Sequence, residues 1–330
     1  MFTQLPPIYF YLPKQDWRSD IPDTADTYWE GFSRGIYCWT LQTYLRLHDF
    51  GFPCQLVNTF PDEGIVIAHR ESLNYELTPT QKTLLVCLKA DQATHPYAQL
   101  HIVQNPQEAK SIRKSLHIPL WSQPGLIPRS PARGSRVENI RYFGISHNLA
   151  PELKDPTWAE SLKKIGLNWQ IRPRESWHDY SDTDVIVAVR NFQQLTTYTW
   201  KPATKLYNSW HACVPAILGC ESAFQSERKG KLDYFQVQSP EEIIDCLTHL
   251  KRNPGLFNAM VDNGRLRAHE TDKRCLTEKW KNALLKFVIP EYERWRNLPR
   301  WRQHLYTNQC HTQIKLKALK RRFSLGELAQ

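Results

Sequence analysis

The chain has 330 residues, a length that allows two domains of ordinary size, each with its own core. Its content of 41% hydrophobic and 23% charged residues is typical of a soluble globular protein. No apolar run approaches the roughly 18 residues of a membrane-spanning helix, and no basic region followed by an apolar core marks a secretory signal. The composition therefore excludes a membrane-spanning chain, and we expect a cytoplasmic protein.

The eight cysteines are spread along the chain without a Cys-x-x-Cys pair. Several of them lie inside apolar runs of strand or helix length. This distribution favours buried, reduced thiols over disulfides or a zinc site, and it predicts no metal site.

The net charge of +10 is unevenly distributed. Residues 291–322 hold nine Lys or Arg against Glu291 and Glu293, a net charge of +7. Most of the excess positive charge therefore lies near the C-terminus rather than over the fold.

The first part of the chain, 1–125, alternates apolar runs of strand length with loops and one helical stretch. This alternation predicts a doubly wound parallel α/β sheet. The expected strands are 8–12, 54–57, 64–68, 84–88 and 100–103, and the expected helix is 32–50. No glycine-rich phosphate loop follows any of these strands, which suits a domain that holds an acceptor rather than a dinucleotide.

Carboxylates follow two strands of this first domain. The loop 14–27 carries four aspartates, and Asp91 follows the strand 84–88. In a transferase with two facing domains such groups would face the cleft, where one of them is a candidate general base for an acceptor hydroxyl. For each of the four loop aspartates, a place in a solvated acidic loop is the simpler alternative.

Residues 119–136 contain four prolines, two glycines and three arginines. Such a stretch cannot form a regular helix, and it predicts the connection between two domains. Residues 126–290 again alternate strands and helices, which predicts a second α/β domain. The expected strands are 140–144, 169–172, 184–189, 214–218 and 234–237, and the expected helices are 152–165, 206–212, one from 240 and one from about 256 toward 270.

The stretch between the strands 184–189 and 214–218 carries the features of a phosphate site. Pro202 suits the first position of a helix, and Lys201 before it offers no oxygen to cap the free N–H groups. Those N–H groups, the Thr204 hydroxyl and the ammonium groups of Lys201 and Lys205 would together suit a bound phosphate. Arg190 ends the neighbouring strand and can reach the same crevice. An ordinary solvated helix start with two surface lysines is the alternative.

Residues 201–224, KPATKLYNSWHACVPAILGCESAF, resemble the donor-binding segment of GT-B glycosyltransferases, in particular the family 4-like group. In that family a helix with a Glu-Ala-Met-Ala-x-Gly-x-Pro-type pattern leads into a buried strand. Here Asn208 stands at the helix glutamate, Cys213 replaces the glycine, and Pro215 is retained. Trp200 stands eight residues before Asn208, so the paired glutamates of the retaining signature are absent and the stereochemistry stays open. The resemblance covers roughly residues 137–290.

The resemblance implies two facing Rossmann-like domains with the active site between them. Gly144 would let the chain pass close to the donor diphosphate, and His147 and Asn148 would contact donor or acceptor. Glu221 falls near the position where family members contact the donor sugar or diphosphate. Turn formation by the two loop residues and a plain surface glutamate are the alternatives.

The last segment, 291–330, interleaves basic residues with aromatic ones. Leu316, Leu319 and Phe323 give its second half an amphipathic helical face. GT-B chains commonly end in a helix that crosses back to the first domain, and part of this segment is a candidate for it. The segment also suits an anionic membrane surface, with a solvated basic tail as the alternative.

The sequence thus predicts a glycosyltransferase of the hexosyltransferase type. It would move a sugar from a nucleotide-diphosphate-sugar to a hydroxyl of a glycan, a lipid-linked or a small-molecule acceptor, without a metal or other cofactor. The donor-binding candidates are Gly144, Asn148, Arg190, Lys201, Thr204 and Lys205, and the catalytic candidates are Asp91, His147 and Glu221.

Three other kinds of protein remain as alternatives. They are a non-catalytic GT-B-like protein that binds sugar nucleotides, a sugar-nucleotide epimerase on the same fold, and a basic nucleic-acid-binding protein. The confinement of the excess positive charge to the C-terminal segment, without a known nucleic-acid motif, argues against the last of these.

Overall fold

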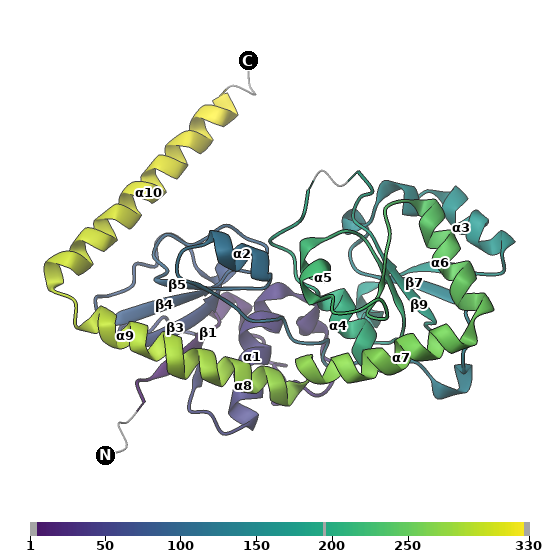
Figure 1. Cartoon of the computed structure of the whole chain (residues 1–330). Coiled ribbons are helices and arrows are strands. Elements are labelled where there is room, and N and C mark those ends of the chain that lie inside the picture. The colour runs from purple at the N-terminus through teal and green to yellow at the C-terminus, as the bar shows by residue number, and fades with distance from the viewer. Residues whose placement is uncertain (1–4, 194–195, 327–330) are drawn as a thin grey trace.

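The computed structural model describes residues 5–193 and 196–326, and the side chains of the last helix up to residue 316. Two parallel sheets, each flanked by helices, lie next to each other (Figure 1). No helix in these residues is both long and apolar enough to cross a bilayer.

The first sheet has six parallel strands in the order β2-β1-β3-β4-β5-β6. They are β1 (Ile8–Tyr11), β2 (Gln55–Val57), β3 (Gly64–His69), β4 (Thr83–Leu88), β5 (Leu100–Val103) and β6 (Ser115–His117). All residues of β3 and β4 are buried, as their apolar sequences require in a sheet covered on both faces. The five predicted strands are present, whereas β6, with three half-buried residues, gave no apolar run to detect.

The predicted helix 32–50 is interrupted. The chain forms a 3-10 turn at Glu30–Ser33 and a π-helical turn at Tyr37–Leu41 before the α-helix α1 (Gln42–Asp49). At Gly31 a Cβ atom would lie 2.0 Å from the ring of Trp29, so the tight turn before the helix requires glycine. A second helix of this domain, α2 (Pro106–Ser111), follows β5 and is capped by Asn105, whose side chain accepts the N–H of Gln107.

The second sheet has five parallel strands in the order β11-β10-β9-β7-β8. They are β7 (Asn139–Phe143), β8 (Asn168–Arg172), β9 (Val185–Ala188), β10 (Ala216–Leu218) and β11 (Phe235–Gln236). The helices are α3 (Pro156–Lys164), α4 (Thr204–His211), α5 (Ser222–Glu227), α6 (Pro240–Arg252) and α7 (Pro254–Ala268). The strand order reverses between β7 and β9 as it does between β1 and β3, so both domains are doubly wound.

Local capping explains where two of these helices begin. Helix α3 starts four residues later than predicted, because Asp155 accepts the N–H of Thr157 at 2.9 Å and Pro156 occupies the first position. Helix α6 begins at Pro240 as predicted, because the Ser239 hydroxyl caps it by accepting the N–H of Glu242 at 3.2 Å.

The C-terminal helices return to the first domain. Helix α7 packs on the second domain, but α8 (Lys273–Ala283) and α9 (Ile289–Arg296) place Leu276, Trp280 and Tyr292 in the core of the first. The chain therefore crosses back to the first domain between α7 and α8. The sequence predicted this crossing later, within the segment 291–330. The chain crosses earlier because the apolar residues that fill the first core begin at Leu276. Two facing doubly wound domains with this return make up the GT-B architecture, as predicted.

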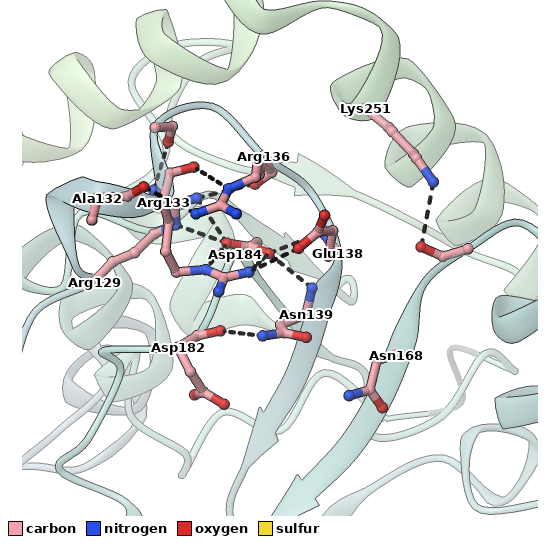
Figure 2. A network of polar contacts seen from close by, with 12 residues as sticks. Arg129, Ala132, Arg133, Arg136, Glu138, Asn139, Asn168, Asp182, Asp184 and Lys251 are labelled. Carbon is pink, nitrogen blue, oxygen red and sulfur yellow. Dashed lines mark hydrogen bonds and ion pairs between the residues drawn. The ribbon is translucent and has the colours of Figure 1, made fainter.

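The connection between the domains is tied to the second sheet by one buried carboxylate (Figure 2). Asp184 is fully buried and accepts six hydrogen bonds of 2.7–3.0 Å. Four come from Arg129 and Arg133 of the connection, and two come from the N–H groups of Glu138 and Asn139 at the start of β7. Burial alone would raise the pKa of Asp184, but the hydrogen bonds, led by that from Arg133, lower it below its ordinary value.

Replacing Asp184 by Ala should destabilise the protein by about 3–5 kcal/mol at neutral pH, because two arginines would lose their buried partner. Since the pKa of Asp184 is lowered by folding, its contribution is present above the unfolded value near 3.9 and is lost as the pH falls through the folded value. Urea unfolding should therefore show that the difference in the free energy of unfolding between wild type and variant becomes smaller at acidic pH.

The matched control is Asp262→Ala, which removes a carboxylate that is 67% exposed and pairs with Arg265. Its effect should stay below about 1 kcal/mol. Equal effects of the two substitutions would contradict the anchoring role of Asp184.

Candidate active site

The carboxyl edges of the two sheets meet at a set of contacts between the domains. Gln104, which follows β5, donates to the backbone oxygen of Trp200 at 2.8 Å. Its neighbour Asn105 donates to the oxygen of Lys201 at 3.1 Å and to the Ser222 hydroxyl at 2.9 Å. Residues after strands of the first domain thus touch the segment before α4 and the first residue of α5. This is the crevice at which open α/β sheets bind ligands.

Helix α4 begins at this crevice without a side-chain cap. Thr204 is its first residue, two positions later than Pro202 suggested, and Ala203 occupies the cap position. The N–H of Leu206 already donates to the Ala203 oxygen at 2.9 Å, so the N–H groups of Thr204 and Lys205 are the ones that a helix start leaves open, and no side chain caps them here. The Thr204 hydroxyl is buried and has no hydrogen-bond partner. An anion bound here could accept hydrogen bonds from the Thr204 hydroxyl and from the neighbouring N–H groups.

Lys205 lies one residue further and points along the end of β7. Its Nζ is 5.3 Å from the centre of the Tyr142 ring. A Cβ on Gly144 would lie 3.2 Å from this Nζ and 2.8 Å from the Tyr142 hydroxyl, so the close approach depends on glycine. Within the described part of the chain, Lys205 makes no ion pair. Burial, followed by the charge of Arg190, lowers the pKa of Lys205 to about 8.

Arg190 follows β9 by two residues and pairs with a second predicted residue. Its Nε donates to Glu221 at 2.8 Å, and both side chains are nearly buried. The Arg190 guanidinium also lies 5.6 Å from the centre of the Tyr198 ring. The structure therefore places Glu221 as the partner that orients Arg190 at the ends of β9 and β10.

Lys201 makes its ion pair across the crevice, with Asp91 of the first domain. The other oxygen of Asp91 accepts a hydrogen bond from Gln104 at 2.5 Å. In this conformation the Lys201 ammonium and the Asp91 carboxylate neutralise each other. Either group must leave the other before it can serve a phosphate or an acceptor hydroxyl.

His69 is a buried residue at the carboxyl end of β3 that the sequence analysis missed. Its Nδ1 accepts the N–H of Glu71 at 3.2 Å. Burial lowers the pKa of His69 to about 4 although the charge of Asp91 opposes the shift. The ring is therefore neutral with its proton on Nε2, which has no partner. A histidine that directly follows the apolar run 64–68 was the available signal.

The other predicted site residues are His147, Asn148 and the aspartates of the loop 14–27. His147 is exposed and Asn148 is half-buried, and both lie in the 3-10 turn after Gly144. Of the aspartates in the loop 14–27, three are held by cations of their own surroundings: Asp16 by Arg34, Asp20 by Arg18, and Asp26 by Arg46 and Lys273. These three carboxylates therefore form ion pairs within the protein.

A cavity of about 130 Å³ opens at the ends of β9 and β10. Its lining includes Arg190, Tyr198, Gly219, Glu221 and Gln225. Sites for small molecules typically measure about 300–1,000 Å³. A ligand of nucleotide-sugar size therefore needs more room than this cavity offers.

The sequence contains one Asp-x-Asp triplet, 182–184, that the expectation of metal-free chemistry overlooked. Asp184 is occupied by arginines at the opposite edge of the sheet, and Asp182 accepts from Arg141 at 3.1 Å. Among residues 5–193 and 196–326, no cluster of three His, Cys, Asp or Glu side chains has the geometry to hold a metal ion. The triplet is a structural feature of the second domain.

The charges at the crevice do not cancel. Arg190 faces Glu221 and Lys201 faces Asp91, while His69 is neutral. Lys205 is the cation left over, beside the free N–H groups of α4. The arrangement can bind an anionic group at the end of β7.

No protein family and no functionally curated protein matches the sequence. Solved structures with a similar fold include TarM, at 10% identity over 73% of this chain, with a TM-score of 0.47. This chain spans 58% of the length of TarM. Sucrose-phosphate synthase from Thermosynechococcus elongatus is 12% identical over 78% of this chain and 79% of its own, with a TM-score of 0.48. HepE from Anabaena, in complex with UDP-glucose, is 9% identical over 86% of this chain and 100% of its own, with a TM-score of 0.49. At identities of 9–12% the likeness concerns the fold alone.

The lowered pKa of Lys205 predicts how anion binding depends on pH. Lys205 is charged below about pH 8 and neutral above it. The affinity for inorganic pyrophosphate should therefore fall about tenfold one pH unit above that value, whereas the variant Lys205→Arg, which stays charged, should not follow this fall. Calorimetric titration of both proteins at each pH measures the ratio of their dissociation constants, which cancels the titration of pyrophosphate itself. A ratio that does not change between pH 7 and 9 would remove Lys205 from the anion site.

Proposed function

We propose that the protein is a glycosyltransferase that transfers a sugar from a nucleotide-diphosphate-sugar to a hydroxyl acceptor in the crevice between its domains. The observation that carries the proposal is the unpaired Lys205 ammonium beside Arg190 and the uncapped start of α4. The Lys205 ammonium, the guanidinium of Arg190 held by Glu221, and the N–H groups at the start of α4 suit a diphosphate better than a neutral ligand.

The same groups explain how the transfer would be accelerated. When the bond between sugar and diphosphate breaks, negative charge grows on the leaving phosphate oxygen. Lys205, Arg190 and the N–H groups of α4 are fixed before the reaction and stabilise that charge more in the transition state than in the ground state. The Glu221 contact keeps the Arg190 side chain in place during this step.

The first domain would supply the acceptor side. Asp91 is the candidate general base, once Lys201 has turned to the donor phosphate and released it. His69, neutral with an unpartnered Nε2–H, would donate a hydrogen bond to a sugar hydroxyl rather than take up a proton. His147 and Asn148, in the 3-10 turn after Gly144, would contact donor or acceptor. A hexose as the transferred sugar is part of this proposal.

The donor site is tested by a thermal-shift screen against UDP-, GDP-, ADP- and CMP-sugars, followed by a transfer assay with the best ligand. One of these donors should raise the melting temperature of the wild type. The variant Lys205→Ala should bind it about 10–100-fold more weakly, because one charge-assisted contact to phosphate is lost.

The control is Lys164→Ala, which removes an exposed lysine at the end of α3 in the same domain and should bind as the wild type does. Unchanged affinity of the Lys205 variant would contradict the proposed site. Binding by the wild type without hydrolysis or transfer would identify a non-catalytic sugar-nucleotide-binding protein.

The transfer should not need a divalent metal, because Lys205 and Arg190 lie where a metal would otherwise neutralise the diphosphate. EDTA should leave the initial rate of transfer unchanged. A rate that EDTA abolishes and Mg²⁺ or Mn²⁺ restores would show that the cations of the chain are insufficient.

A further inference from the structure

The last helix, α10 (Arg300–Gly326), uses one face to dock on the first domain. Gln303 donates to the oxygens of Gln81 and Trp295 at 3.1 and 2.8 Å. One and two turns further, Tyr306 donates to the oxygen of Tyr97 at 3.2 Å and Cys310 to that of Pro96 at 3.0 Å. The ring of His311 also contacts that of Tyr97, with the ring centres 5.5 Å apart. The far end of the helix stands clear of both domains (Figure 1).

The opposite face of α10 is apolar and exposed. Trp301, Leu305 and Leu316 are 62%, 50% and 53% exposed. At about 100° per residue they fall within about 60° of one another around the helix axis. The centre of this stripe lies about 140° from the centre of the hydrogen-bonding residues of the docked face, so packing on the first domain cannot cover it. We call these three residues the outer stripe.

The charged residues in and just before α10 are all positive. From Arg294 to Gly326 the sequence contains nine Lys or Arg and no Asp or Glu. Arg302 and Lys315, both exposed, flank the outer stripe on its two sides, each about 40° from its nearer edge. An apolar stripe between rows of cations on one helix is the pattern of segments that lie in a membrane interface.

We propose that the outer stripe of α10 and its flanking cations dock on an anionic lipid bilayer. The apolar side chains enter the boundary between headgroups and acyl chains, and the cations contact lipid phosphates. A second copy of the chain fits this face less well, because like charges would meet along both flanks without a carboxylate to pair with. A nucleic acid would use the cations but would leave the outer stripe in water.

The proposal rests on residues of α10 alone and does not depend on the transferase proposed above. It is tested with the full-length protein by flotation with vesicles of phosphatidylcholine alone and of phosphatidylcholine mixed with phosphatidylglycerol. The wild type should bind the mixed vesicles, and added salt should weaken that binding. The double variant Leu305→Ser/Leu316→Ser should partition at least about tenfold less into the mixed vesicles.

The matched control is Leu266→Ser/Leu285→Ser, which removes two exposed leucines, 71% and 42% exposed, from outside α10. It should bind the mixed vesicles as the wild type does, and both variants should keep the melting temperature of the wild type. The proposal is overturned if the wild type does not bind mixed vesicles, or if the stripe variant and the control bind them equally. Light scattering that shows a wild-type dimer split by the stripe variant, without vesicle binding, would assign the face to a second copy. Salt-dependent binding of DNA by both variants alike, again without vesicle binding, would assign the cations to nucleic acid.

Discussion

The site depends on a constraint of parallel sheets: all strands end at the same edge, so side chains that follow different strands gather there. In this chain two such edges face each other. The six hydrogen bonds on Asp184 hold the connection to the second sheet, and Leu276 and Trp280 bring the C-terminal helices back to the first core. These two attachments lie far apart in the sequence, and together they keep the edges opposed.

The opposed edges bring together charges of the two domains. Asp91 of the first domain neutralises Lys201 of the second, and Glu221 neutralises Arg190, which leaves Lys205 without a carboxylate. Burial and the neighbouring Arg190 make the charged form of Lys205 costly, as its lowered pKa shows. In the proposed reaction an incoming diphosphate would relieve this cost, and by drawing Lys201 away it would free Asp91. Donor binding and preparation of the acceptor side would then be coupled through a single ion pair.

The sequence predicted the doubly wound fold and its longer strands because their apolar runs are continuous, as in 64–68 and 84–88. It placed Arg190, Thr204 and Lys205 at one crevice because strand ends and helix starts can be recognised locally. Contacts between distant segments escaped it. The Asp91–Lys201 pair joins residues 110 positions apart, and the passage of α8 to the first core depends on shape rather than on a local pattern. His69 was missed because a single histidine after a strand is usually a structural residue.

The most direct measurement is a crystal structure with the nucleoside diphosphate that best raises the melting temperature. The account predicts the diphosphate at the start of α4, with Lys205 Nζ and the Thr204 N–H within hydrogen-bond distance of its oxygens. It also predicts that Lys201 has moved from Asp91 toward the diphosphate. A diphosphate bound elsewhere, with Lys205 still over the Tyr142 ring and Lys201 still on Asp91, would contradict the account.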